Sequence, residues 1–174
     1  MDYNYTFKIM LFGELSSGKE NLIKRYVSEY FDEDGKLTRG VDFCSKTIDY
    51  KGKIVKLQFW DLADEPHFRY FISQYCKGAN GTLVLFDVTN AKTLDRLREW
   101  NQTIKEHAGD IPIMLVGNER ILDKPREISR EKGNELVKKF NLSDYTEIST
   151  MTGEGIEKLF QRLAELLLEK VKNL

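Results

Sequence analysis

The segment FKIMLFGELSSGKENLIKRY, residues 7–26, constrains the fold more than any other part of the chain. An apolar run suited to a buried strand is followed by Gly13, Gly18 and Lys19 in the spacing G-x-x-x-x-G-K, and then by an amphipathic segment from Asn21 that predicts a helix. These are the parts of a phosphate-binding loop, in which glycines let backbone N–H groups converge at a helix N-terminus. An ordinary glycine-containing turn between a strand and a helix is the alternative, and the spacing favours the phosphate loop over it. The position after Lys19 normally holds Ser or Thr as a Mg²⁺ ligand, and here it is Glu20.

Length and composition favour one globular domain spanning residues 1–174, with 27 basic and 28 acidic residues and a net charge of −1. This balance argues against nucleic acid as a partner. We find neither an apolar run long enough to span a membrane nor a signal-peptide pattern at the N-terminus. The two cysteines, Cys44 and Cys76, favour a reducing, cytoplasmic location and buried thiols. The end EKVKNL has no Cys for prenylation, so we expect no intrinsic membrane anchor.

The rest of the chain alternates between strand and helix patterns. Strands are predicted over residues 7–12, 41–50, 53–60, 82–88, 111–116 and 144–148, and helices over 21–29, 68–77, 94–107, 129–140 and 155–171. A hairpin signal at Lys51-Gly52 makes one strand antiparallel. The pattern predicts an α/β fold: a mostly parallel six-stranded sheet with helices on both faces and one antiparallel edge strand. Ligands of such sheets bind at the carboxyl ends of the strands.

Five segments have a familiar order. They are TRGVDF (38–43), KLQFWDLADEPHF (56–68), YCKGANGTLVLFDVT (75–89), LVGN (115–118) and EISTMTGEGIEKLF (147–160). Over about residues 7–170 the chain resembles a small GTPase of the Ras superfamily, most closely of the Rab branch. The resemblance implies a P-loop G-domain, GDP or GTP with Mg²⁺, and GTP hydrolysis controlled by two switch loops.

The resemblance also implies a set of ligand-binding positions. For Mg²⁺ these are Thr38 and Asp61, with Glu20 at the place of the metal-binding hydroxyl. The positions that correspond to nucleotide contacts are Gly13, Ser16, Ser17, Gly18, Lys19, Glu20, Phe31, Thr38, Asp64, Asn118, Glu119, Ile121, Ser149, Thr150 and Met151.

Several of these positions depart from the family pattern. Glu65 replaces the catalytic Gln that orients the attacking water, and an ionised Glu cannot donate a hydrogen bond to the phosphoryl group. Ile121 replaces the Asp that selects guanine, which removes two charge-assisted hydrogen bonds. Asp64 replaces a Gly, and Glu119 replaces a Lys. Together with Glu20 and Glu65 they place four carboxylates around a site that binds a polyanion in the family.

A second group of residues keeps the family pattern. Phe43, Trp60 and Tyr75 stand where Rab proteins carry three aromatic side chains that dock protein effectors. Partial burial at the edge of the sheet is the simpler explanation for the same residues.

Three functions remain open. We favour a Rab-like pseudo-GTPase, a binding module with weak or absent nucleotide binding and very slow or no hydrolysis. The alternatives are a divergent but working GTPase switch with Mg²⁺, and a protein that binds another phosphate compound through Lys19 and the loop.

Overall fold

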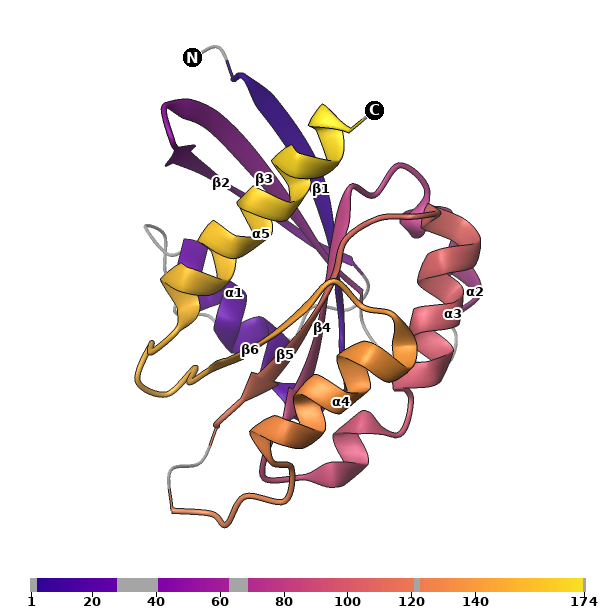
Figure 1. Ribbon diagram of the computed structural model, residues 1–174, viewed down its shortest axis with the longest axis vertical. Helices are drawn as coiled ribbons and strands as arrows, with labels where there is room; N and C mark the ends of the chain where they lie inside the picture. Colours follow the sequence, from indigo (N-terminus) through magenta and orange to yellow (C-terminus); the bar gives the residue numbers. More distant parts are fainter. Residues whose placement is uncertain (1–2, 28–40, 63–68, 121–122, 174) are drawn as a thin grey trace.

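The computed structural model describes residues 3–27, 41–62, 69–120 and 123–173, and its centre is a six-stranded sheet (Figure 1). The strands are β1 (Tyr5–Phe12), β2 (Val41–Tyr50), β3 (Lys53–Leu62), β4 (Gly81–Asp87), β5 (Ile113–Asn118) and β6 (Asp144–Ile148). Their order is β2-β3-β1-β4-β5-β6, with β2 antiparallel to β3 and every other pair parallel. This confirms the predicted α/β fold, while the extent of the domain over residues 1–174 stays a prediction.

Helices cover both faces of the sheet (Figure 1). They are α1 (Lys19–Val27), α2 (Arg69–Cys76), α3 (Leu97–Ala108), α4 (Arg130–Phe140) and α5 (Ile156–Lys172), with short 3₁₀ turns η1 (Leu15–Ser17) and η2 (Ala91–Leu94). Helices α1 and α5 lie on one face, where Tyr26 stacks on Phe160 with ring centroids 3.6 Å apart. Helices α2, α3 and α4 lie on the other face over a second apolar core. None of the helices in the described ranges is both long and apolar enough to cross a membrane.

Local sequence signals predicted where a turn forms and where a helix begins. The hairpin forms at Lys51-Gly52, where both residues have positive φ (51° and 75°) as a two-residue turn of this kind requires. Ser129, the first residue of the predicted helix 129–140, caps α4, since its side chain accepts a hydrogen bond from the Lys132 N–H at 3.1 Å.

Several details of the prediction were wrong, including the bounds of β5 and the start of α1. Strand β3 extends to Leu62, so Asp61 belongs to the strand and not to the loop after it. Helix α3 begins at Leu97 rather than Leu94, because Asn90 caps the separate turn η2 first. Cys44 is half-buried rather than buried, and both cysteines are free thiols.

Candidate functional site

The carboxyl ends of the parallel strands meet along one edge of the sheet, and the predicted ligand positions gather there. The phosphate loop, residues 13–18, follows β1, and Asp61 lies one residue before the end of β3. Asn118 ends β5 and Ser149 follows β6. Phe31, Thr38, Asp64, Glu65 and Ile121 are predicted site residues that lie outside the described residues.

The glycines of the phosphate loop leave no room for a side chain. Gly13 has a φ of +151°, and a Cβ there would lie 2.6 Å from Ser17 Oγ. Gly18 has a φ of +90°, and its Cβ would lie 2.3 Å from Asn118 Nδ2. The loop is closed by the Ser17 N–H, which donates to the Glu14 carbonyl at 2.9 Å. The backbone therefore forms a tight turn between β1 and α1 that only glycine permits at these two positions.

Lys19 is engaged within the protein. Its side chain forms an ion pair with Asp61, with 3.2 Å between Nζ and Oδ1, and Nζ also donates to the Leu62 carbonyl at 3.3 Å. Only 5% of Lys19 is exposed. The Lys19 ammonium, which a phosphate loop offers to its ligand, is thus paired with Asp61, the carboxylate that the resemblance assigns to Mg²⁺.

Glu20 lies next to this ion pair, in the first turn of α1. Glu20 and Asp61 line one small cavity of about 30 Å³, which has room for a water molecule. Within the described ranges, no group of three or more His, Cys, Asp or Glu side chains could hold a metal ion. The rest of this cavity is lined by Leu11, Ile23, Lys24, Cys44 and Phe59.

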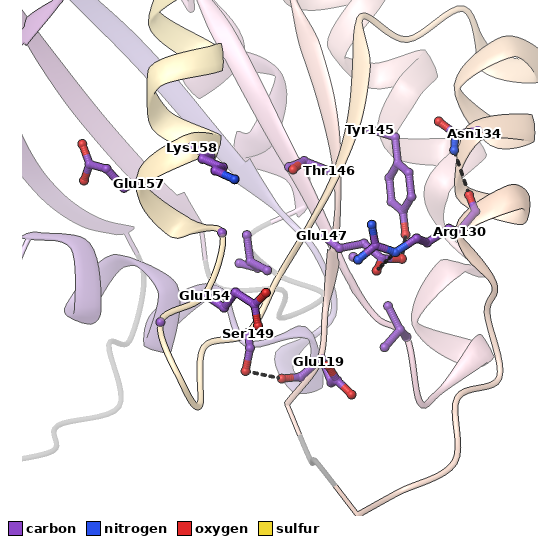
Figure 2. A pocket seen from close by; sticks show the side chains of 15 residues that line it. Glu119, Arg130, Asn134, Tyr145, Thr146, Glu147, Ser149, Glu154, Glu157 and Lys158 are labelled. Carbon is purple, nitrogen blue, oxygen red and sulfur yellow. Dashed lines mark hydrogen bonds and ion pairs between the residues drawn. The ribbon is translucent and has the colours of Figure 1, made fainter.

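Asn118 is buried and joins the two loops of the site. Its Nδ2 donates to the Ser17 carbonyl at 2.9 Å and to Thr150 Oγ1 at 3.1 Å, and its Oδ1 accepts from the Thr150 N–H at 3.0 Å. The second loop, residues 149–155, is further ordered by Ser149, whose Oγ donates to the Glu119 carbonyl at 3.1 Å (Figure 2). Glu119 itself is exposed, and so is Met151.

Two arginines that sequence reasoning missed also hold these loops. Arg120 Nη1 donates to the Ser16 carbonyl, and Arg25 donates to the carbonyls of Thr150 and Met151 at 2.8 and 2.6 Å. The available signal was position: Arg120 lies inside the segment NERI that begins with Asn118, and Arg25 lies in the helix after the loop. Neither matches a family motif, so neither was singled out.

A guanine nucleotide with Mg²⁺ fits the described residues only in part. The loop backbone fits, because Gly13 and Gly18 permit the tight turn of a phosphate loop between β1 and α1. The charged groups do not fit in this arrangement, because Lys19 and Asp61 are paired and Glu20 adds a carboxylate. The geometry therefore supplies no basis for deriving a hydrolytic step.

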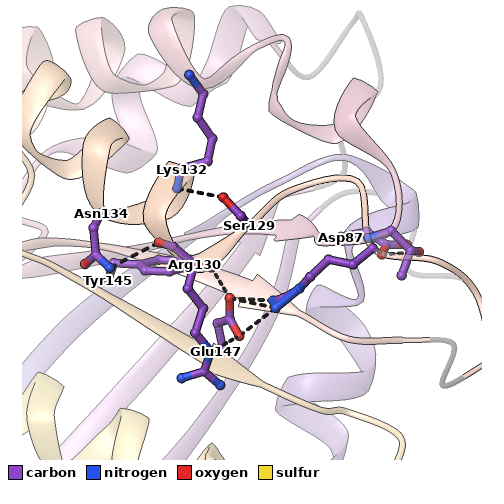
Figure 3. Close-up of polar contacts among 9 residues, drawn as sticks. Asp87, Ser129, Arg130, Lys132, Asn134, Tyr145 and Glu147 are labelled. Carbon is purple, nitrogen blue, oxygen red and sulfur yellow. Dashed lines mark hydrogen bonds and ion pairs between the residues drawn. The ribbon is translucent and has the colours of Figure 1, made fainter.

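A larger pocket of about 600 Å³ lies at the outer edge of β6, between the N-terminal ends of α4 and α5 (Figure 2). Its wall includes Glu147, which accepts hydrogen bonds from Arg126 and from the Tyr145 hydroxyl and pairs with Arg130 Nε at 3.0 Å (Figure 3). Burial and the Glu147 carboxylate raise the pKa of Tyr145. The ring of Tyr145 fills the space beside Gly133, where a Cβ would lie 2.2 Å from the ring. These contacts fix α4 against β6.

The three predicted docking aromatics lie together. Phe43 stands opposite Trp60 across β2 and β3 with ring centroids 5.1 Å apart, and Tyr75 of α2 lies 6.0 Å from Trp60. Phe43 is 50% exposed, whereas Trp60 and Tyr75 are half-buried against the second core. Tyr70 and Phe71, also on α2, are exposed. The structure thus brings the three residues into one aromatic surface and leaves one ring open to contact.

Comparison with known proteins identifies the family of this chain. The model of the Ras family matches residues 8–169. The Ras-related protein SEC4 of Candida albicans is 36% identical over 169 residues, covering 97% of this chain and 80% of the relative. The Ras-related proteins Rab2BV of Beta vulgaris and RABA2d of Arabidopsis thaliana are each 37% identical, covering 93% and 95% of this chain and 76% of each relative. The chain therefore belongs to the Ras family of small GTPases and, within it, to the Rab branch.

Proposed function

We propose that this chain is a Rab-like binding module in which nucleotide chemistry is reduced. Membership of the family implies GDP or GTP with Mg²⁺ as ligands and protein effectors as partners. The proposal goes further: guanine-nucleotide binding is weak or absent, and GTP hydrolysis is very slow or does not occur.

The Lys19–Asp61 ion pair carries the proposal. A phosphate ligand needs the Lys19 ammonium, and Mg²⁺ needs the Asp61 carboxylate, yet the two groups lie 3.2 Å apart with Lys19 buried. Separating a buried ion pair costs about 3–5 kcal/mol unless new partners compensate. Nucleotide binding to this chain would therefore have to separate this pair and give both groups new partners.

Glu20 adds to that cost. Glu20 and Asp61 both line a small cavity, together with Lys24, and a phosphate ligand would add negative charge near two acidic residues. The sequence places Asp64, Glu65 and Glu119 at further ligand positions, and all of them are acidic. One substitution of this kind can be balanced by a water molecule or a shifted ion, but several together favour loss of the ligand.

The deciding experiment is the nucleotide content of the purified protein. Protein prepared under native conditions with Mg²⁺ present is denatured, and any released nucleotide is identified by chromatography. We expect a folded protein with far less than one nucleotide per chain. Stoichiometric GDP or GTP would overturn the proposal.

A paired substitution tests the physical explanation. Glu20→Ser together with Ile121→Asp restores the metal-binding hydroxyl and the guanine acceptor, so guanine-nucleotide affinity should rise by at least tenfold in a binding titration. Asp95→Ser, which removes an exposed carboxylate from the turn η2, is the matched control and should change nothing. An unchanged affinity in the paired variant would show that the acidic lining is not the cause.

A working GTPase switch is the second candidate. Two observations favour it: the loop keeps its glycine geometry, and relatives with Rab and SEC4 names match almost the whole chain. In that case the protein should release phosphate from GTP steadily, and Lys19→Ala should abolish the release. Phosphate release that is equal in both proteins would exclude this candidate.

Protein effectors are the partners that we propose for the aromatic surface, Phe43, Trp60 and Tyr75. Aromatic anchors with one exposed ring are common at the centre of interfaces. Trp60 is already held in place by Phe43, by Tyr75 and by Lys8, whose Nζ lies 4.7 Å from the Trp60 ring. A partner would therefore meet a surface whose side chains need little reordering.

A further inference from the structure

The two loops at the candidate site are connected by side chains from β5, from the segment that follows it and from α1. The phosphate loop (13–18) receives hydrogen bonds from Asn118 and Arg120, and the second loop (149–155) receives them from Asn118 and Arg25. Asn118 is a family position, whereas the two arginines belong to none of the motifs described above. We call Arg25 and Arg120 the loop latch.

Arg120 contacts the phosphate loop at two residues. Its Nη1 donates to the Ser16 carbonyl, and its stem packs on Gly18, where a Cβ would lie 3.3 Å from Arg120 Cδ. The contact joins residues 104 positions apart in the chain. A guanidinium holds such a place well, because it stays charged and its planar fork loses little freedom on binding.

Arg25 does the same for the second loop. From α1, its Nε donates to the Thr150 carbonyl at 2.8 Å and its Nη2 to the Met151 carbonyl at 2.6 Å. Gly153 has a φ of +88°, and a Cβ there would lie 2.9 Å from Arg25 Nη1. The loop therefore curls around the guanidinium, and the two donors hold two successive carbonyls.

Asn118 connects the two halves, so one series of hydrogen bonds runs from α1 through both loops to the end of β5. Loop carbonyls need partners in a folded protein. In this chain Ser16, Ser17, Thr150 and Met151 all have their carbonyl partners within the protein.

We propose that Arg25 and Arg120 are positioning residues that hold the two loops folded without any bound ligand. The inference rests on the proposed function, which it deepens by naming the groups that replace the ligand's role in ordering the site. It explains how the two loops of the site stay folded in a chain that, by the proposed function, binds nucleotide weakly or not at all.

Hydrogen exchange of the nucleotide-free protein tests the latch. The protein is stripped with EDTA and a phosphatase, checked by chromatography, and measured at two amides that are protected by hydrogen bonds. These are Ser17 N–H, bonded to Glu14, and Gly153 N–H, bonded to Ser149. Arg120→Ala should speed exchange at Ser17 by about tenfold, and Arg25→Ala should do so at Gly153, since each loses one or two charge-assisted hydrogen bonds.

Two further variants separate positioning from general stability. Lys124→Ala removes an exposed cation from the same segment as Arg120 and should leave both amides unchanged. Arg120→Lys keeps the charge but not the fork, and it should restore part of the protection at Ser17. Unchanged exchange at Ser17 and Gly153 in the alanine variants, or an equal increase at every amide of the sheet, would overturn the proposal.

The result is separable from the proposed function. If the purified protein proves to carry stoichiometric nucleotide, the proposed function fails, but exchange in the stripped protein still decides whether the latch holds the loops. If the protein is empty and the alanine variants show no local change, the proposed function stands and the latch does not.

Discussion

The phosphate loop and the aromatic surface lie on the same sheet and differ in where their chemical groups are directed. At the loop, the Lys19 ammonium, the Asn118 amide and the Arg120 guanidinium all have partners within the chain. At the aromatic surface, Phe43 is half exposed, and Tyr70 nearby is 79% exposed. The loop is thus arranged like a structural element, and the aromatic surface like an interface. We therefore expect substitutions at the loop to cost more stability than substitutions at the aromatic surface.

The largest expected effect is at Gly18. Gly18→Ala would place a Cβ 2.3 Å from Asn118 Nδ2 at a positive φ, so it should lower the free energy of unfolding by about 3 kcal/mol. Gly52→Ala is the matched control, because Gly52 also has a positive φ but faces open space, and it should cost only about 1 kcal/mol. Urea denaturation measures both, and equal losses would mean that the loop is not packed as described.

Lys19→Ala comes next. It removes the ammonium that pairs with Asp61, so the nucleotide-free protein should lose about 3 kcal/mol of stability, the low end of the range for a buried pair, because 14% of the Asp61 side chain is exposed. Lys124→Ala removes an exposed cation and should lose almost nothing. A Lys19→Ala protein as stable as the parent would contradict the contrast between the phosphate loop and the aromatic surface, since the loop would then not depend on the Lys19–Asp61 ion pair.

A smaller effect concerns pH and the Cys76 thiol beneath the aromatic surface. Burial raises the pKa of Cys76 from 9.0 to about 11. The folded state therefore favours the neutral thiol, so its contribution is complete below pH 9.0 and is lost as the pH rises to about 11. The parent should lose about 2 kcal/mol more than Cys76→Ala between these two pH values. Identical alkaline profiles would contradict the burial of this thiol.

The smallest effect on stability is expected for Phe43→Ala. Half of Phe43 is exposed and its cross-strand contact with Trp60 is the main loss, so the free energy of unfolding should fall by less than about 1 kcal/mol. Urea denaturation of this variant beside Lys19→Ala gives the comparison directly. A loss as large as that of Lys19→Ala would mean that Phe43 supports the fold rather than a partner.

The sequence predicted most of the fold because the relevant signals are local. Alternating residues and the Lys51-Gly52 turn placed β2 at the bounds found in the structure, and Ser129 marked the start of α4. The edge to which the site residues converge also followed from the parallel direction of the strands. The contacts of Arg25 and Arg120 could not be predicted, because they join segments more than 100 residues apart through loop paths that no local pattern specifies. The pairing of Lys19 with Asp61 was missed for a different reason, since the family pattern assigns each of them to a ligand.

The contact between Gly133 and Tyr145 has a consequence for how sequences of this kind can diverge. The Tyr145 ring fills the volume that any side chain at position 133 would need, and its hydroxyl is held by Glu147. A larger residue at 133 is therefore acceptable only together with a smaller one at 145. We expect the two positions to change as a pair among related chains, so that covariation between them would report the docking of α4 on β6.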